Sequence, residues 1–284
     1  MKKGLVLEGG AMRGLFTAGV IDALLEHNIE FDGAVGVSAG AAFGVNYKSK
    51  QIGRSLRYNL RFAGNPRYAS WKSWLRSGNL YGANFCYHLI PDELDKFDKK
   101  EFIQNPMEFW SVSTDASTGE ANYHLLTDCG YLDLEWVRAS ASIPFFANPV
   151  AIHGHFYFDG GVSDSIPIRF AQKHYDKNVI ITTQPKEYRK AADRLWPIEK
   201  IVLRKYPNVL KKVKTRSQDY NNCLDYIEKE EIAGSVFVIR PPEALDIGTI
   251  ETNKDNIKRV YNIGYYEAER QLEKLVEFLR EEDR

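Results

Sequence analysis

The sequence predicts a three-layer α/β/α fold with a mostly parallel central sheet and a helical C-terminal extension. Three observations lead to this prediction. Short strand-like runs alternate with helical patterns, a glycine-rich loop follows the first run directly, and the second run ends at a serine between glycines. Alternation of strands and helices is typical of βαβ units, in which helices cover both faces of a parallel sheet.

The first expected strand is the apolar run at residues 4–8, and the loop after it opens onto an amphipathic helix that reaches His27. Backbone N–H groups at a helix N-terminus have no intrahelical partner and carry the positive end of the helix dipole. The loop is therefore a candidate oxyanion hole, because it can hold negative charge without a side chain. The residues that we expect to shape it are Gly9, Gly10, Ala11, Arg13 and Gly14.

A dinucleotide-binding turn makes the same demand on the backbone and is the alternative interpretation of this loop. In such a turn, glycines let a pyrophosphate approach the N-terminus of a helix. Ala11 replaces the middle glycine of the GxGxxG pattern, although Asp32 lies at a suitable distance along the chain for a ribose-binding acid. On this interpretation the serine of the next motif needs no catalytic partner.

The second expected strand, residues 31–37, runs into the pentapeptide GVSAG, which is the only GxSxG of the chain and carries Ser38 at its centre. A serine on a strained strand-to-helix turn needs small neighbours, because larger side chains would collide with the adjacent strand and helix. Ser38 is thus a candidate nucleophile, with Gly36 and Gly40 shaping the turn. The alternative interpretation of these five residues is an ordinary tight turn without a catalytic serine.

A further expected strand, residues 155–158, ends in Asp159 and is followed by Gly160 and Gly161. An aspartate at a strand end presents its carboxylate at the rim where α/β folds gather their chemistry. An ordinary Asp-Gly turn is the alternative, since such dipeptides are common between elements. Asp159 is therefore a candidate catalytic acid or base.

The histidines do not suggest a catalytic triad. The usual α/β-hydrolase order is serine, acid and then histidine, but the only histidine after Asp159 is His174, in a run that looks helical. We expect His153 and His155 to face solvent. His155 lies an even number of positions before Asp159, so on a regular strand it would point the same way and is at most a supporting residue.

A glycine loop with an arginine, a GxSxG and a downstream DGG, in this order, closely resemble the patatin-like phospholipase family. The resemblance extends to residues 109–120 and 139–144 and covers about the first 185 residues. It implies a patatin-like fold and a catalytic dyad of Ser38 and Asp159 that works without histidine, metal or organic cofactor. One departure is Ala11, where the family usually has a third consecutive glycine; a methyl group is tolerated there if φ is negative.

The resemblance implies hydrolysis of carboxylic ester bonds of phospholipids or lysophospholipids through an acyl-enzyme. Ser38 would attack the carbonyl carbon while Asp159 accepts its proton, and water would then release the acyl group. The pKa of a free aspartate, about 3.9, is low for a base near neutrality, so burial or close positioning is required. Backbone N–H groups of Gly10 and Ala11 would hold the oxyanion, and Arg13 would support the loop, face a substrate anion or form a structural salt bridge.

Two alternatives stay open. A general carboxylesterase acting on soluble esters would use the same chemistry. A non-catalytic nucleotide- or lipid-binding module would use the glycine loop to hold a phosphate, but it would leave the DGG motif without an explanation.

The composition indicates a cytoplasmic protein without a nucleic-acid partner. The 284 residues are 44% hydrophobic, which allows a substantial core, and 38 basic residues balance 38 acidic ones. No apolar stretch approaches the ~18 residues of a membrane-spanning helix, and the basic start is interrupted too early for a secretory signal. Three widely spaced cysteines suggest neither a disulfide framework nor a metal site.

Residues 56–90 are unusually aromatic for a segment that directly follows the expected elbow helix. Packing of helices on the sheet is the favoured interpretation, because aromatic side chains supply much of any core. The alternative is a wall or lid of an acyl-chain pocket. The aromatic residues are Tyr58, Phe62, Tyr68, Trp71, Trp74, Tyr81, Phe85 and Tyr87.

We divide the chain into a catalytic domain, residues 1–186, and a mostly helical extension packed on it, residues 187–284. A strand expected at residues 235–239 needs a partner and should join an edge of the main sheet. The basic run at residues 211–216 is interpreted as a solvated helix face, with transient contact to an anionic membrane surface as the alternative. Headgroup, acyl chain length and oligomeric state do not follow from these motifs.

Overall fold

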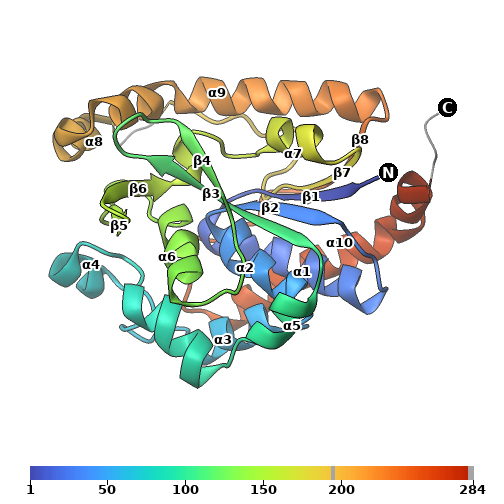
Figure 1. Ribbon diagram of the computed structural model, residues 1–284, viewed down its shortest axis with the longest axis horizontal. Helices are drawn as coiled ribbons and strands as arrows, with labels where there is room; N and C mark the ends of the chain where they lie inside the picture. The colour runs from blue at the N-terminus through green and yellow to red at the C-terminus, as the bar shows by residue number, and fades with distance from the viewer. Residues whose placement is uncertain (193–195, 281–284) are drawn as a thin grey trace.

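A computed structural model describes residues 1–192 and 196–280, which fold around one mixed β-sheet (Figure 1). The strands are β1 (Lys3–Leu7), β2 (Gly33–Val37), β3 (Glu108–Asp115), β4 (Ala121–Leu125), β5 (Val150–Ile152), β6 (His155–Asp159), β7 (Lys177–Ile181) and β8 (Val236–Ile239). Their order is β5–β6–β3–β2–β1–β7–β8, and β4 pairs with β3 beside this path. The five strands from β3 to β8 in this order run parallel, whereas β4, β5 and β6 are antiparallel to their neighbours. The predicted mostly parallel sheet is thus confirmed.

Helices cover both faces of the sheet. The α-helices are α1 (Gly14–Glu26), α2 (Ala39–Lys48), α3 (Arg54–Phe62), α4 (Trp71–Ser77), α5 (Lys99–Gln104), α6 (Tyr131–Ser140), α7 (Ile168–His174), α8 (Trp196–Val202), α9 (Pro207–Ile232) and α10 (Lys254–Arg280). Shorter or wider helical turns are η1 (Ala11–Arg13), η2 (Phe85–Leu94), η3 (Gly160–Val162) and η4 (Leu203–Lys205). In Figure 1, α7 and α9 lie on one side of the sheet and α1, α2 and α10 on the other, so the fold has three layers.

The first strand shows why the central strands are apolar throughout. Leu5 and Leu7 belong to the core on the side of α1, α2 and α10, whereas Val6 belongs to the core on the side of α7 and α9. Successive side chains of a strand point to opposite faces, and both faces of a parallel sheet are covered. Strict alternation with polar residues is therefore not expected in β1, and all three side chains are fully buried.

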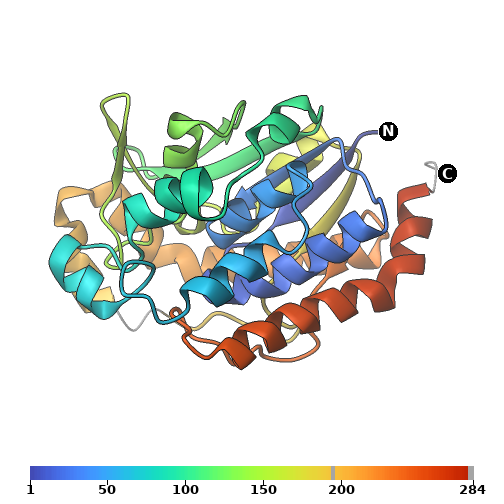
Figure 2. The ribbon, with the colours of Figure 1, turned by 90° about the horizontal axis from the view of Figure 1, so that it is seen from below.

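The C-terminal part of the chain contributes to every layer. β8 pairs in parallel with β7 at the edge of the sheet, which confirms the partner expected for this strand. α9 packs over one face, and α10 runs along α1 on the other face (Figure 2). α1 and α10 approach closely, because a Cβ on Gly264 would lie 2.0 Å from the carbonyl oxygen of Phe16, and one on Gly19 would lie 2.0 Å from that of Tyr261.

The strand register brings the ends of β2 and β6 to one level of the sheet. Val37 pairs with Val112 of β3, and the next residue of β3, Ser113, pairs with Asp159. Ser38 follows Val37 directly, so it leaves β2 at the level where β6 ends. Two motifs more than a hundred residues apart in the sequence therefore meet across β3.

Candidate active site

Ser38 occupies a strained turn between the end of β2 and the start of α2. Its φ of 54° and ψ of −119° are rarely adopted by residues other than glycine. A Cβ on Gly36 would lie 2.7 Å from the carbonyl oxygen of Gly40, and one on Gly40 would lie 2.4 Å from that of Leu7. Side chains at these two positions would therefore prevent the turn that carries Ser38.

The end of α6 holds both candidate catalytic residues. The Ser38 N–H donates to the hydroxyl of Ser140 at 2.8 Å, and the Asp159 N–H donates to the carbonyl of Ser142 at 2.9 Å. Ser140 is fully buried. Ser140 lies in residues 139–144, to which the family resemblance extends, but its contact with Ser38, 102 residues away along the chain, was not predicted.

The carboxyl group of Asp159 is buried, and one of its oxygens lacks a regular hydrogen bond. Oδ1 accepts from the Gly161 N–H at 2.7 Å, whereas Oδ2 has no partner of regular geometry in the described part of the chain. Burial raises the pKa of Asp159 to about 6, against the opposing effects of the Ser38 hydroxyl and the Arg216 charge. The Ser38 hydroxyl thus lies near enough to influence the carboxyl group without a regular hydrogen bond to it.

The glycine loop lies against Ser38. A Cβ on Gly9 would lie 2.9 Å from the Cβ of Ser38, and one on Gly10 would lie 2.7 Å from Oγ1 of Thr183. Within residues 1–192 and 196–280, no backbone carbonyl accepts from the N–H of Gly10 or of Ala11. These two N–H groups are therefore not used by the described backbone, which is compatible with the oxyanion-hole interpretation.

Gly14 and Gly160 are also confined by close neighbours. A Cβ on Gly14 would lie 2.7 Å from the Cβ of Ala39, the first residue after the serine. A Cβ on Gly160 would lie 2.3 Å from the carbonyl oxygen of Val112. The glycines of all three motifs therefore allow backbone segments to approach one another around Ser38.

Ala11 departs from the expected backbone conformation. Its φ is 48°, so the condition that φ be negative at this position is not met. The left-handed region costs an L-residue about 1–2 kcal/mol, because Cβ comes too close to the following carbonyl oxygen. The loop holds this strained conformation directly beside Ser38, where surrounding contacts can maintain it.

Arg13 lies on the side of the site where Glu8 is buried. Glu8 accepts from the hydroxyl of Tyr220 at 2.6 Å and from the N–H of Thr183 at 2.5 Å. Burial raises the pKa of Glu8, and these hydrogen bonds and the Arg13 charge oppose the rise. Arg13 forms no ion pair with a carboxylate of the described residues, and its buried Nε has no hydrogen-bond partner among them.

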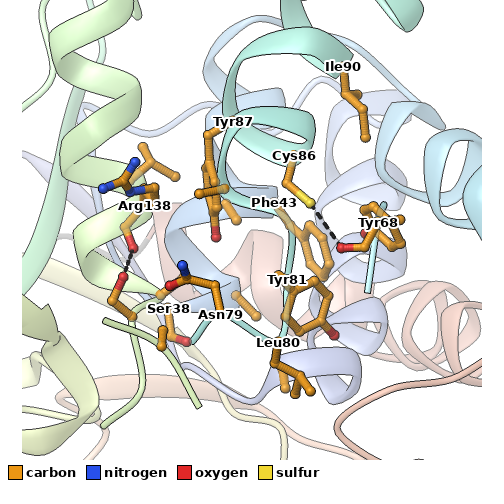
Figure 3. A pocket seen from close by; sticks show the side chains of 18 of the residues that line it. Ser38, Phe43, Tyr68, Asn79, Leu80, Tyr81, Cys86, Tyr87, Ile90 and Arg138 are labelled. Carbon is orange, nitrogen blue, oxygen red and sulfur yellow. Dashed lines mark hydrogen bonds between the residues drawn. The ribbon is translucent and has the colours of Figure 1, made fainter. Parts of the chain in front are cut away.

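Two cavities meet at Ser38. The first is mainly apolar and runs between α2, α3 and the segment from residue 79 to η2; it is called the apolar cavity below. Its walls include Phe43, Tyr58, Tyr68, Leu80, Tyr81, Tyr87 and Ile90. In Figure 3, Ser38 lies at one end of this space, and the side chains of Tyr81 and Tyr87 stand around it.

The second cavity, called the polar cavity below, lies on the side of the glycine loop and Asp159. Its walls include Glu8, Arg13, Gln184, Tyr188, Lys190, Arg216 and Tyr220. Ala11, Ser38 and Ile143 line both cavities. A molecule with an apolar part and a polar part can therefore place the bond between them at the serine.

The aromatic side chains of residues 56–90 both pack in the core and form walls of a cavity. Tyr58, Phe62, Tyr68 and Phe85 are buried in a hydrophobic cluster with Phe43. Several of these rings also form walls of the apolar cavity. The favoured packing interpretation is thus confirmed, and the same packing shapes the cavity.

The histidines lie away from Ser38. His153 and His155 are exposed and line neither cavity. His174 stacks on Phe170, and its Nδ1 lies 2.8 Å from the carbonyl oxygen of that residue. None of the three can act as the third member of a triad with Ser38 and Asp159 in this arrangement.

The basic run at residues 211–216 is only partly a solvated face. Val213 is buried, and Lys212 pairs with Glu120 at 3.3 Å. Arg216, at the end of the run, turns inward, and its Nε donates to the carbonyl of Gly161 at 2.6 Å. Sequence analysis missed Arg216 and Lys190 as residues of the site, because helical spacing on α9 does not show that this helix crosses the DGG motif.

The profile of the family described as "Patatin-like phospholipase" matches residues 5–171, which include every motif described above. The chain belongs to the patatin-like phospholipase family. At the level of the family, membership indicates a hydrolase of lipid acyl esters. Residues 206–280 match a second profile, described as "Domain of unknown function (DUF6363)".

Relatives with this kind of domain occur in bacteria and fungi. "Uncharacterized protein YjjU" of Escherichia coli is 27% identical over 269 residues, which cover 92% of this chain and 74% of that protein. "Lysophospholipase nte1" of Emericella nidulans is 26% identical over 292 residues, which cover 96% of this chain but only 18% of that protein. The crystal structure of VipD from Legionella pneumophila aligns with a TM-score of 0.47 at 13% identity, over 96% of this chain and 67% of that one.

No helix in the described part of the chain is long and apolar enough to cross a membrane. Within the same residues, no group of three or more histidine, cysteine, aspartate or glutamate side chains could hold a metal ion. The three cysteines, Cys86, Cys129 and Cys223, are all free thiols.

Proposed function

We propose that this chain is a serine acyl hydrolase that cleaves carboxylic ester bonds of phospholipids or lysophospholipids, with Ser38 as nucleophile and Asp159 as base. The observation that carries the proposal is the position of Ser38 where the apolar and polar cavities meet. The acyl chain would lie among the aromatic side chains, and the glycerol and headgroup would lie in the polar cavity. The ester carbonyl would then lie at the serine.

The first step is acyl transfer to the enzyme. The Ser38 oxygen attacks the carbonyl carbon, and its proton passes to Oδ2 of Asp159, the oxygen that has no regular hydrogen bond in the described residues. When the tetrahedral intermediate collapses, the same proton passes to the departing alcohol oxygen. In the second step Asp159 takes a proton from water, and the resulting hydroxide attacks the acyl carbon. When this second intermediate collapses, Asp159 returns the proton to the Ser38 oxygen, so the carboxylic acid leaves and both residues are regenerated.

Backbone N–H groups of the glycine loop would stabilise the oxyanion in both steps. Those of Gly10 and Ala11 lie beside Ser38 and donate to no described backbone carbonyl, and the Ala39 N–H at the start of α2 adds a third candidate donor. Loss of one such donor typically raises a barrier by about 3–4 kcal/mol. Gly9, Gly14, Gly36, Gly40, Gly160 and Gly161 support this arrangement by allowing the close approach of backbone segments.

A fluorophosphonate probe tests the proposal, because it labels an activated serine covalently. We expect an adduct on Ser38, located by peptide mass spectrometry, and hydrolysis of a short-chain lysophospholipid. Ser38→Ala and Asp159→Asn should each lower kcat/KM by about 10³-fold or more. Asp164→Asn is the matched control, since this half-buried carboxyl group accepts a hydrogen bond from Tyr123 at 2.7 Å but lines neither cavity.

Two outcomes would favour a different function. Tight dinucleotide binding by calorimetry without labelling of Ser38 would support a binding module. Equal activity on short soluble esters and on lipids would favour a general carboxylesterase. Location in the cytoplasm, transient contact with a membrane surface and the domain division at residue 186 remain predictions from the sequence.

A further inference from the structure

Among the described residues that line the polar cavity, cationic side chains outnumber carboxyl groups. Arg13, Lys190 and Arg216 line it, together with the two carboxyl groups of Glu8 and Asp159. Both carboxyl groups are buried, and burial raises the pKa of each. Neither Arg13 nor Arg216 pairs with a carboxylate of the described residues, so these two guanidinium groups are the ones in this lining that can bind an anion.

Neither carboxyl group forms an ion pair with Arg13 or Arg216 in the described part of the chain. Glu8 accepts from Tyr220 and from both the N–H and the hydroxyl of Thr183. Asp159 accepts from Gly161 and is the base of the proposed function.

Arg216 reaches the cavity from α9 and retains most of its hydrogen-bonding capacity. Its Nε donates to the carbonyl of Gly161, whereas neither Nη group donates to a described residue. Nη2 would lie 3.3 Å from a Cβ on Gly161, so the free end of the guanidinium lies beside the DGG motif. A guanidinium presents a planar pair of donors that matches a phosphate.

The cationic groups come from two parts of the chain. Arg13 belongs to the glycine loop, whereas Lys190 and Arg216 lie beyond residue 171, where the match to the patatin-like profile ends. Arg216 belongs to the region whose profile has no described function. A contact of this region with a headgroup would affect which substrate binds, whereas the bond is cleaved at Ser38.

We propose that Arg216, together with Arg13 in the lining of the same cavity, binds the phosphate of a net-anionic headgroup, so that the C-terminal region selects the substrate. The inference rests on the proposed hydrolase function and narrows its substrate class. Esters whose headgroup is net negative, such as lysophosphatidylglycerol, are preferred over zwitterionic lysophosphatidylcholine and neutral monoacylglycerol. A zwitterion brings its own cation close to the guanidinium groups of Arg13 and Arg216, and like charges repel.

Headgroup selection is measured with those three esters, all carrying the same short acyl chain and all kept below their micelle concentrations. Monomeric substrate removes the effect of surface charge on binding. We expect kcat/KM to be about tenfold or more higher for the anionic ester than for the neutral one, since hydrogen bonds to charged groups are the strong ones. Arg216→Gln should remove most of this preference, mainly through KM, and Arg216→Lys should restore part of it.

Arg216 also contacts the DGG motif, so its substitution can lower activity on every substrate. The test is therefore the ratio of kcat/KM for the anionic ester to kcat/KM for the neutral ester. A purely structural role of Arg216 would lower kcat/KM equally for the anionic and neutral esters, and that result would overturn the inference. Lys212→Gln is the matched control, because Lys212 lies on the same helix but pairs with Glu120 and lines neither cavity. It should leave the ratio unchanged.

A second measurement separates this inference from the proposed function. Glycerol 3-phosphate, titrated by calorimetry into the Ser38→Ala protein, should bind, and the added Arg216→Gln change should weaken binding about tenfold or more. Labelled Ser38 with equal kcat/KM for all three esters would overturn headgroup selection and leave the hydrolase intact. Absence of both labelling and hydrolysis would remove the proposed function, and headgroup selection with it.

Discussion

The buried carboxyl group of Asp159 makes the proposed reaction depend on pH. A general base must be ionised, and the pKa of this group is raised to about 6 by burial. We expect kcat/KM for a neutral ester to fall about tenfold for each pH unit below that value and to level off above it. Stopped assays between pH 4.5 and 8, with folding checked by circular dichroism at each pH, measure the profile. A rate that is flat down to pH 4.5 would contradict the role of Asp159 as base.

The same shift predicts that Asp159 destabilises the folded protein at neutral pH. An acid whose pKa is higher in the folded state than in the unfolded state holds its proton more tightly when folded, so its stability contribution declines as pH rises from 3.8 to about 6. Asp159→Asn should therefore increase the free energy of unfolding at pH 7, by up to about 3 kcal/mol for a pKa raised from 3.8 to about 6. Urea denaturation measures this change.

A second carboxyl group provides a control of opposite sign. Hydrogen bonds from Ser117 and Thr118 lower the pKa of Asp115, more than offsetting the effect of burial. Asp115→Asn should thus lower the free energy of unfolding at pH 7 and change it little at pH 3. An unchanged or lowered stability of Asp159→Asn, with Asp115→Asn behaving as expected, would show that Asp159 is not a strained residue.

The methyl group of Ala11 also strains the site. Because φ is 48° there, we expect Ala11→Gly to stabilise the protein by about 0.5–1 kcal/mol, after the greater freedom of glycine in the unfolded chain is subtracted. Thermal melts measure the gain, and labelling of Ser38 should persist. Ala18→Gly, inside α1, should have the opposite effect of about 1 kcal/mol or more. Destabilisation by both substitutions would mean that the methyl group packs favourably.

At the scale of elements, sequence patterns predicted what depends on neighbours along the chain. The glycine loop after β1, the turn at Ser38 and the edge strand β8 all follow from local periodicity and residue size. Sequence analysis assigned no element to the wide helical turn η2, which contains Pro91, a residue that disrupts regular helices. The inward turn of Arg216 was missed as well, because it depends on where α9 crosses the sheet.

The crossing of α1 and α10 depends on two glycines, and it gives a test at this scale. A Cβ on Gly264 would lie 2.0 Å from the Phe16 carbonyl oxygen, so Gly264→Ala forces the helices apart. We expect a loss of about 1–3 kcal/mol from overpacking, which exceeds the gain of about 1 kcal/mol in helix propensity. Asn262→Ala, on the exposed side of α10, should be neutral or stabilising. Chemical denaturation of both variants decides between these effects.

At the scale of the whole molecule, the C-terminal region contributes to the same sheet and the same apolar core as the first 186 residues. β8 is a strand of the same sheet, α10 covers α1, and Tyr220 of α9 donates to the buried carboxyl group of Glu8 at 2.6 Å. A chain ending at residue 186 would expose the edge of β7 and the apolar side of α1. It would also leave Glu8 without one of its hydrogen-bond donors.

We therefore expect residues 1–186 alone to show no cooperative thermal transition and no labelling of Ser38, although all three patatin motifs are present. Co-expression with residues 187–284 should restore both, since the sheet and the α1–α10 contact can form between two chains. A fragment 1–186 that melts cooperatively and carries the adduct would instead establish an independent catalytic domain. In that case headgroup selection by Arg216 would have to act across a separable interface, and the fragment would lose the preference for anionic esters while keeping its activity on neutral ones.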